Sequence, residues 1–438
     1  MEKGQNLYTK AKRIIPGGTQ LLSKRPEMFL PDLWPSYYSK AKGCKVTDLD
    51  NKEYIDVCYM GIGACVLGYA FDTVDNAAKL AIDNGGMCTL NSPEEVQLAN
   101  KLIELHPWAD MVRYGKAGGE AMAIAVRIAR AYTNKDIVLI CGYHGWQDWY
   151  IATNLGDTSA LNAHHLSGLE PVGVPKHLKG STLPFLYNNV QEFKELVEKN
   201  KGRIAAVVME PVRNNFPQQD FINEIRKYTK KNNIVLIFDE ITAGFRLTCG
   251  GSHKDKRIGV EPDIAVFGKA IANGYPITAI IGRGEIMSAA QESFISSTFW
   301  TERIGLTAAL ASIKFFEENN VEEHLKQTGL KVQEVWGNAA KRFELDIKIS
   351  GILPLIHFEF KTEEPLVAKT YFTQLMLERG FLASTAFYSS FAHTEQILDE
   401  YKVAVNAVFE EIARANVVGN MKDLLKGPIC HAGFQRLN

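Results

Sequence analysis

Val235-Leu-Ile-Phe-Asp239-Glu240 and, after a loop, Ile264-Ala-Val-Phe-Gly268-Lys269 are two short apolar runs that each end close to a charged residue. Continuous apolar runs of this length are typical of fully buried strands. We therefore predict two buried strands, with Asp239 at the end of one and Lys269 at the end of the next. Buried strands between amphipathic helices indicate an α/β fold with a mainly parallel sheet covered on both faces.

Lys269 and Asp239 form a pair with a specific chemistry. A lysine that ends a buried strand is poorly solvated, so its amine can be neutral and nucleophilic, and a nearby aspartate can protonate a heterocyclic nitrogen. Pyridoxal phosphate needs both groups: a lysine that binds it as an aldimine and a carboxylate that makes its ring an electron sink. Either residue alone is more often a cap or a solvated strand end. The pair together predicts an enzyme that acts on amino groups.

The composition is that of a large globular protein. The 438 residues exceed what one hydrophobic core usually serves, which predicts a large domain and at least one smaller one. Hydrophobic residues make up 46% of the chain, charged residues 23%, and the net charge is -1. These are ordinary values that give no indication of nucleic acid or an anionic membrane as a partner.

The cysteines are seven in number and scattered, and they include no C-x-x-C pair. This spacing argues against a zinc cluster or a disulfide framework and favours a reducing compartment. The first residues are polar and helix-compatible, and no apolar run is long enough to span a bilayer. We therefore expect a cytoplasmic protein with no metal centre and no membrane association.

Two patterns of periodicity divide the chain. Residues 44–50 and 53–57 alternate around Asp50-Asn51, which predicts an antiparallel hairpin. From about Pro93, helical and strand patterns alternate. We expect helices at 94–105, 121–132, 221–231 and 395–415 and over a long stretch after Gly305, strands at 136–141 and 204–209, and renewed alternation at 347–360.

This organisation predicts a central cofactor domain flanked by a smaller one. We expect residues 91–330 to form the large, cofactor-binding domain. Residues 1–90 and 331–438 are expected to form a small α+β domain made from both chain ends.

Two glycine-containing motifs suit the same cofactor. Gly118 and Gly119 open an Ala-rich helix, where bare backbone N–H groups and the helix dipole favour an anion such as the cofactor phosphate. Gly142-Tyr143-His144-Gly145 follows the strand at 136–141, at the edge where open α/β sheets bind ligands. Tyr143 can stack on the pyridine ring. His144 is either an acid/base group or a hydrogen-bonded structural histidine, because Lys269 itself can move the proton.

In order and spacing, these motifs resemble class III pyridoxal-phosphate-dependent aminotransferases over nearly the whole chain. The matching segments are Gly118-Gly119-Glu-Ala, Tyr143-His144-Gly, Met209-Glu210-Pro-Val, Phe238-Asp239-Glu240-Ile241, Gly244-Phe-Arg246 and Phe267-Gly268-Lys269. The glutamate-1-semialdehyde aminomutase branch is the most similar, through Ile14-Ile-Pro-Gly-Gly18, Tyr143-His-Gly and Ala392-His393-Thr394. The resemblance implies fold type I, with a central, mainly parallel sheet of the seven-stranded type.

The resemblance also implies roles for individual residues. Lys269 would be the aldimine lysine and Asp239 the partner of the pyridinium nitrogen. The other cofactor contacts implied are Gly118 and Gly119 at the phosphate, Tyr143 and Ile241 on the two faces of the ring, and Asn215 at the phenolic oxygen, with Glu210 supporting them. Thr298 would reach the phosphate of the neighbouring subunit, which implies a homodimer with shared active sites.

The departures from that branch concern the substrate. Lys24 and Arg25 stand where the aminomutases carry an arginine for a substrate carboxylate, and their acidic gate residue is missing from the segment 384–388. Thr298-Phe-Trp300-Thr-Glu-Arg303 replaces a small Ser-Gly-Asn-Pro segment. The residues expected at the substrate are Lys24, Arg25, Trp34 and Arg303.

Such changes alter the charge and shape of the pocket, so we favour an aminotransferase that uses a small-molecule amino donor and a carbonyl acceptor. Amino transfer would pass through the Lys269 aldimine and pyridoxamine phosphate. An intramolecular 2,1-aminomutase of the glutamate-1-semialdehyde type and a pyridoxal-phosphate decarboxylase or racemase remain alternatives, because all use the same lysine and aspartate.

Overall fold

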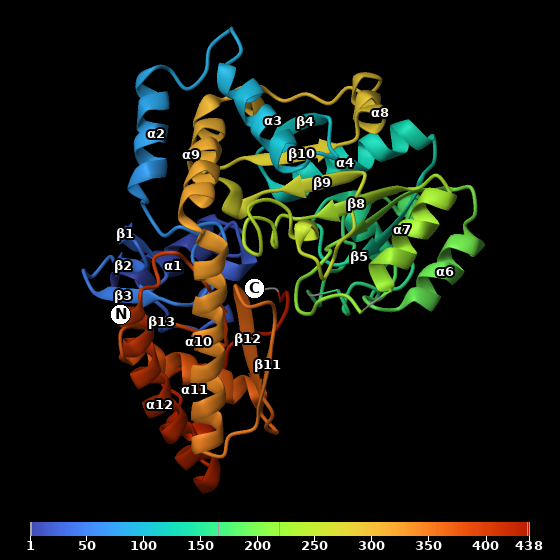
Figure 1. Ribbon diagram of the computed structural model, residues 1–438. Helices are drawn as coiled ribbons and strands as arrows, with labels where there is room; N and C mark the ends of the chain where they lie inside the picture. Colours follow the sequence, from blue (N-terminus) through green and yellow to red (C-terminus); the bar gives the residue numbers. More distant parts are fainter. Residues whose placement is uncertain (1, 165, 219, 436, 438) are drawn as a thin grey trace. The chain divides into compact units, whose positions relative to one another are not determined.

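A computed structural model describes residues 2–164, 166–218, 220–435 and 437 (Figure 1). The chain divides into two compact units. The central unit is Asp72–Glu322, and the terminal unit combines Met1–Phe71 with Glu323–Asn438.

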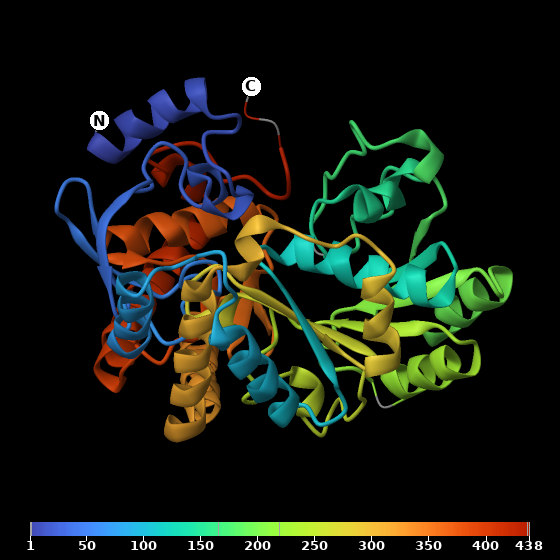
Figure 2. The same cartoon turned by 90° about the horizontal axis from the view of Figure 1, so that it is seen from above.

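The central unit is built on a sheet of seven strands in the order β4-β10-β9-β8-β7-β5-β6 (Figure 1, Figure 2). Its strands are β4 (Met111–Gly115), β5 (Ile137–Cys141), β6 (Thr182–Pro184), β7 (Ile204–Met209), β8 (Val235–Asp239), β9 (Ile264–Phe267) and β10 (Thr278–Gly282). Strand β10 is antiparallel to β4 and to β9, and the other neighbours are parallel. The predicted mainly parallel, seven-stranded sheet is confirmed.

Helices cover this sheet because its inner strands are apolar on both faces. Every residue of β5, β7, β8, β9 and β10 is buried. Helix α4 (Gly118–Thr133) packs its apolar side across β7, β8, β9 and β10. The other helices of the unit are α2 (Asp72–Asp83), α3 (Pro93–Leu105), α5 (Asp148–Ile151), α6 (Val190–Lys199), α7 (Phe221–Lys231), α8 (Gly284–Met287) and α9 (Arg303–Asn319).

The terminal unit contains two small antiparallel-rich sheets. The first, in the order β1-β2-β3-β13, consists of β1 (Tyr38–Lys42), β2 (Lys45–Asp48), β3 (Glu53–Asp56) and β13 (Phe381–Leu382). Strands β2 and β3 form the predicted antiparallel hairpin, and β13 joins β3 in parallel, which unites residues from both chain ends. The second sheet contains β11 (Ile347–Ser350), β12 (Leu355–Phe360) and β14 (Ala386–Tyr388).

Helices complete the terminal unit around an aromatic-rich core. They are α1 (Lys3–Ile14), α10 (Val321–Arg342), α11 (Pro365–Glu378) and α12 (Glu395–Val418). The core includes Trp336, Phe358, Phe372 and Phe409. In the described part of the chain, no helix is both long and apolar enough to cross a membrane.

Some elements differ from the sequence-based expectation. The long helical stretch after Gly305 is two helices, α9 and α10, separated by Asn320 in a left-handed conformation at φ 47°. The alternating segment 347–360 is two strands joined by a turn in which Gly351 has φ 102°. Helix α11 was not predicted from the sequence.

Candidate active site

Asp239 and Lys269 lie at the carboxyl ends of two neighbouring parallel strands. Asp239 is the last residue of β8 and is opposite Val266 of β9. Lys269 follows β9 by two residues and opens a short 3-10 helix, Lys269–Ala272. This edge of an open α/β sheet is where ligands bind. The structure therefore brings together the two residues on which the sequence argument depends.

The Lys269 amine is held by a neighbouring loop. Lys269 Nζ donates a hydrogen bond of 2.8 Å to Thr242 Oγ1. Lys269 itself adopts φ 46°, a left-handed conformation that is strained for a residue other than glycine. Burial, followed by the nearby positive charges of Arg213 and Arg246, lowers the pKa of Lys269 to about 8. A lysine with this pKa is a much better nucleophile at neutral pH than a solvated one.

Asp239 is buried, and its carboxylate is held in place by two contacts. His144 Nδ1 lies 2.8 Å from Asp239 Oδ2, and the Ile241 amide donates to Asp239 Oδ1 at 3.1 Å. The exposed fractions of Asp239 and His144 are 4% and 2%. A buried carboxylate oriented by two hydrogen bonds is suited to pair with a protonated ring nitrogen.

The glycines at the start of α4 form a cradle without side chains. Gly118 and Gly119 are its first residues, so their amides have no carbonyl partner within the helix. A Cβ on Gly118 would lie 3.0 Å from Ile241 Cδ1, and one on Gly119 would lie 2.2 Å from Gln147 Oε1. Gly145, at φ 109°, packs so closely that a Cβ would lie 2.9 Å from Gly119 Cα. The two glycine motifs are therefore in direct contact, and the positive φ and the backbone contact at Gly145 require glycine there.

Glu210 connects the loop of Tyr143 to an arginine. It follows β7, and its Oε2 accepts a hydrogen bond from the Tyr143 amide at 3.2 Å. Glu210 Oε1 accepts from Arg213 Nη1 at 2.7 Å. Gly142, at φ 125°, allows this approach, because a Cβ there would lie 2.8 Å from Glu210 Oε2.

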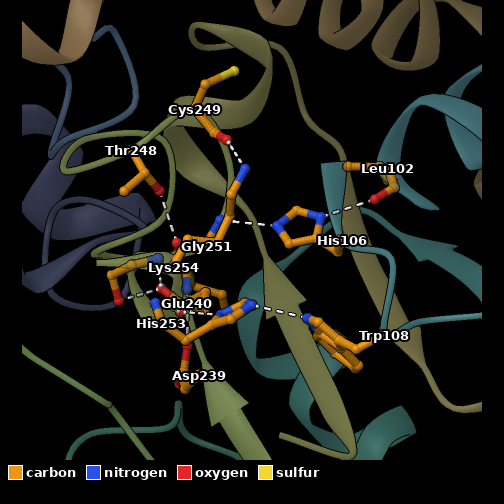
Figure 3. A network of polar contacts seen from close by, with 12 residues as sticks. Leu102, His106, Trp108, Asp239, Glu240, Thr248, Cys249, Gly251, His253 and Lys254 are labelled. Carbon is orange, nitrogen blue, oxygen red and sulfur yellow. Dashed lines mark hydrogen bonds and ion pairs between the residues drawn. The ribbon is translucent and has the colours of Figure 1, made fainter. Parts of the chain in front are cut away.

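A buried network fixes the chain that follows Asp239 (Figure 3). Glu240 accepts hydrogen bonds from the Ser252 amide and hydroxyl and from the His253 amide and Nδ1, at 2.7 to 3.0 Å. Trp108 Nε1 donates to His253 Nε2 at 3.1 Å. Because His253 Nε2 is an acceptor, its Nδ1 carries the proton and the imidazole is neutral. These bonds lower the pKa of Glu240 despite its burial, so the carboxylate remains charged and anchors the Thr242 loop.

A second histidine extends the network. His106 Nδ1 contacts the Leu102 carbonyl at 2.8 Å, and the Gly251 amide donates to His106 Nε2 at 2.9 Å (Figure 3). Burial lowers the pKa of His106 to about 3, so this imidazole is also neutral. The end of α3 is thereby tied to the loop that begins at Asp239.

The other predicted site residues of the central unit are either exposed at its surface or already in contact with neighbouring side chains. Asn215 is exposed in the loop after β7, and Thr298 is exposed at the start of the 3-10 helix Thr298–Thr301. The Ile241 side chain packs against the core under α4. Arg303 Nη2 contacts Glu94 Oε1 at 2.5 Å. The guanidinium expected at the substrate is thus already paired with a carboxylate of α3.

Three predicted substrate residues belong to the terminal unit. Lys24 is exposed, and Arg25 Nη1 donates to the Gln435 carbonyl at 2.9 Å. Trp34 is buried and stacks on Phe29 with ring centroids 4.5 Å apart. Within this unit, Arg25 and Trp34 have structural partners of their own.

Sequence reasoning missed several residues at the candidate site. Thr242, Gln147 and Arg213 have no motif of their own, and the pairing of His144 with Asp239 cannot be read from their separation of 95 positions. One signal was present for Arg213, which directly follows the motif Met209-Glu210-Pro-Val of the resemblance.

These residues fit pyridoxal phosphate. The glycine cradle, which a Cβ would fill, offers unpaired amides to a phosphate. A buried, hydrogen-bonded carboxylate suits a pyridinium nitrogen, and an amine of lowered pKa suits an aldehyde. In the described residues, no group of three or more His, Cys, Asp or Glu side chains is placed to hold a metal ion.

Comparisons with known proteins agree with this fit. The sequence profile of the family "Aminotransferase class-III" matches residues 32–390. The chain is 31% identical over 427 residues to a 3-aminobutyryl-CoA aminotransferase of Cloacimonas acidaminovorans, covering 94% of this chain and 97% of the relative. It is 32% identical over 422 residues to a glutamate-1-semialdehyde 2,1-aminomutase of Methanococcoides burtonii, covering 91% and 97%. The FumI protein of Sphingopyxis sp. MTA144, solved in its PLP internal aldimine form, superposes with a TM-score of 0.85 at 25% identity, covering 95% and 97%.

Proposed function

The chain belongs to the class-III aminotransferase family and is a pyridoxal-phosphate enzyme, and we propose that Lys269 and Asp239 are the residues through which it moves an amino group from a donor to a carbonyl acceptor. The observation that carries this proposal is their position at the ends of β8 and β9, each with a polar partner: His144 for Asp239 and Thr242 for Lys269. When bound, the cofactor supplies an electron sink that stabilises a carbanion at the substrate carbon.

Asp239 would keep the cofactor's ring nitrogen protonated. Its carboxylate is buried and oriented by His144 and by the Ile241 amide, so little reorganisation is needed when charge develops on the ring. In this assignment His144 is a positioning residue, since its Nδ1 is engaged by Asp239. Its Nε2 is buried and has no hydrogen-bond partner among the described residues.

Lys269 would bind the cofactor covalently and, once released, move a proton at the substrate carbon through its Nζ. A pKa of about 8 places the amine close to the working pH of a general base. Relative to a solvated lysine, the neutral fraction at pH 7 rises by roughly two orders of magnitude. Thr242 Oγ1 would hold Nζ in place between these steps.

We assign the other cofactor contacts to further residues predicted for this site. We assign the amides of Gly118 and Gly119 to the phosphate, the side chains of Tyr143 and Ile241 to the two ring faces, and Asn215 to the phenolic oxygen. The contact between Gly145 and Gly119 supports a fixed distance between the stacking loop and the phosphate cradle.

The active enzyme would be a homodimer with shared sites. Thr298 would donate to the phosphate bound by the partner subunit. Thr298 is exposed, and so are the large apolar side chains of Phe294, at 88%, and Phe299, at 65%. This exposure supports burial of the segment by a second copy of the chain.

The remaining assignments concern the substrate and the compartment. Arg303 would reach a substrate only by exchanging its partner Glu94, whereas Lys24, Arg25 and Trp34 would act from the terminal unit. The seven cysteines, all in the described part of the chain, form no disulfide, which supports a location in the cytoplasm.

An aminomutase is the second candidate, because the chain is 32% identical to glutamate-1-semialdehyde 2,1-aminomutases. An absorbance titration of the holoenzyme with single amino donors distinguishes the reactions. An aminotransferase converts the cofactor to its pyridoxamine form and releases a keto or aldehyde product. Release of an isomer of the donor would favour the aminomutase, and release of carbon dioxide or of the mirror-image amine would favour a decarboxylase or racemase. Failure of every donor to convert the cofactor would contradict the proposal.

A further inference from the structure

Gln147 is a glutamine beside the glycine cradle to which the predicted roles give no task. It precedes α5, and its carbonyl accepts hydrogen bonds from the amides of Tyr150 and Ile151, at 2.9 and 3.1 Å, which fix its backbone. Its side chain is half-buried. A Cβ on Gly119 would lie 2.2 Å from Gln147 Oε1 and 2.5 Å from Nε2. The amide group of Gln147 therefore occupies the space in which a side chain of Gly119 would lie.

The orientation of this amide group is set by a hydrogen bond. Gln147 Oε1 accepts from the Trp146 amide at 3.1 Å, and a Cβ on Gly145 would lie 2.6 Å from the same oxygen. The reversed orientation would place two N–H donors against each other, because an amide nitrogen donates and does not accept. Among the residues that the structure describes, Nε2 has no hydrogen-bond partner. Gln147 thus holds a donor ready beside Gly119.

The first turn of α4 supplies backbone donors at the same place. The amides of Gly118 and Gly119 have no carbonyl partner within the helix. The Glu120 carboxylate turns back to the amides of Lys116 and Ala117, at 2.8 and 3.3 Å, so it satisfies the two donors that precede the cradle. A phosphate monoester has three strong acceptor oxygens, which is more than two backbone amides satisfy. The cradle therefore has room for a further donor.

We propose that Gln147 is a further phosphate-binding residue, whose Nε2 donates to the cofactor phosphate beside the amides of Gly118 and Gly119. This inference rests on the proposed function, because it takes the cradle as the phosphate site. Gln147 would supply at Gly119 the side-chain donor that the glycine itself lacks. A hydrogen bond to a charged oxygen is stronger than one between neutral groups, and the Trp146 contact holds the donor in place before the cofactor binds.

The test compares ligands with and without the phosphate group. Pyridoxal phosphate and pyridoxal are titrated into the full-length apoprotein by absorbance, and inorganic phosphate is titrated by calorimetry. We expect Gln147→Met, which keeps the length of the side chain but not its donor, to raise the Kd for pyridoxal phosphate and for inorganic phosphate by roughly 10- to 100-fold. The Kd for pyridoxal should change by less than about threefold, because pyridoxal brings no phosphate to the cradle.

A second variant separates the donor from the contact with Trp146. Gln147→Glu keeps an oxygen that can accept from the Trp146 amide and replaces Nε2 by a charged oxygen. It should weaken pyridoxal phosphate more than Gln147→Met does, by at least about a hundredfold, because two negative groups then face each other. The control for added charge is Gln191→Glu, on the exposed face of α6, which should change each Kd by less than about twofold.

The outcomes distinguish this inference from the proposed function, because inorganic phosphate needs neither Lys269 nor Asp239. Weaker binding of pyridoxal phosphate and phosphate in both Gln147 variants would support the role of Gln147, whether or not any amino donor converts the cofactor. Parent-like affinity for pyridoxal phosphate in Gln147→Glu would overturn that role, even in an active aminotransferase. An equal loss for pyridoxal and pyridoxal phosphate would assign the effect to the packing of the cradle and would also overturn it.

Discussion

Asp239 and Glu240 are consecutive residues, yet each buries its carboxylate against a different histidine. Asp239 contacts His144 and Glu240 contacts His253, both at 2.8 Å. The first pair orients the carboxylate that we assign to the cofactor, and the second anchors the chain that follows Asp239 (Figure 3). One strand end therefore supplies both the carboxylate that we assign to the cofactor and the fixed frame that holds it, which is the arrangement expected of a preorganised site.

Replacing Asp239 by asparagine should remove catalysis but leave the fold. An amide can still bond His144, but it does not hold the cofactor's ring nitrogen protonated, so the transition state loses several kcal/mol, on the order of a thousandfold in kcat. Steady-state kinetics measures the loss of catalysis, and cofactor absorbance shows whether the folded variant still binds the cofactor. Asp157→Asn, in an exposed loop, is the control and should retain full activity. Activity of Asp239→Asn within about tenfold of the parent would exclude the assigned role.

The lowered pKa of Lys269 predicts how cofactor loading depends on pH. Only the neutral amine attacks the aldehyde, so the rate of reconstitution of the apoprotein should rise about tenfold per pH unit and level off near pH 8. Stopped-flow absorbance after addition of pyridoxal phosphate measures this rate. Arg213→Gln should move the midpoint upward, because it removes a nearby positive charge. A rate that keeps rising to pH 10 in the parent would show an ordinary, solvated lysine.

Gly145→Ala should weaken cofactor binding by separating the two glycine motifs. Its Cβ would lie 2.9 Å from Gly119 Cα, a backbone atom, so the phosphate cradle has to shift. Gly173→Ala is a matched control, since Gly173 has φ 87° but nothing within 4 Å of a Cβ. We expect both variants to lose a similar amount of stability from backbone strain, of about 1 kcal/mol, while the Kd for the cofactor rises at least tenfold only in Gly145→Ala. Equal affinities in the two variants would refute the contact as a constraint on the cradle.

Assembly is tested by mixing two inactive chains. If Thr298 reaches the partner's phosphate, a Lys269→Ala chain and a Thr298→Ala chain form one intact site per mixed dimer, from Lys269 of one chain and Thr298 of the other. With random pairing, half of the dimers are mixed, so about a quarter of the parent activity should return at limiting cofactor. Sedimentation confirms the dimer. Recovery of no activity, or full activity in a monomer, would rule out shared sites.

The strands were predictable because their environment is uniform. Residues 204–209 and 235–239 are buried on both faces of the sheet, so the sequence is an unbroken apolar run ended by a carboxylate. Helix α11 was not predicted, because it too is mostly buried. Ten of its fourteen residues are buried, so it has no polar face and no helical periodicity.

The candidate site could be proposed from the sequence where its residues coincide with the end of an element. Lys269 and Asp239 stand at the ends of apolar runs, and Gly118 and Gly119 begin a helix, so their positions in the fold could be predicted from the sequence. The contacts of Thr242 and Arg213 depend instead on loop conformation, including the left-handed φ of 46° at Lys269. Loop conformations of this kind are set by the surrounding packing and hydrogen bonds, such as those of Glu240 with His253, rather than by local sequence.

Chemical trapping of the cofactor tests the central claim most directly. Borohydride reduction of the holoenzyme fixes the cofactor on the lysine that holds it, and peptide mapping by mass spectrometry identifies that lysine. Our account predicts pyridoxyl on Lys269, on the peptide that also contains Phe267 and Gly268, and no label in Lys269→Ala. Label on any other lysine of the parent protein would contradict it.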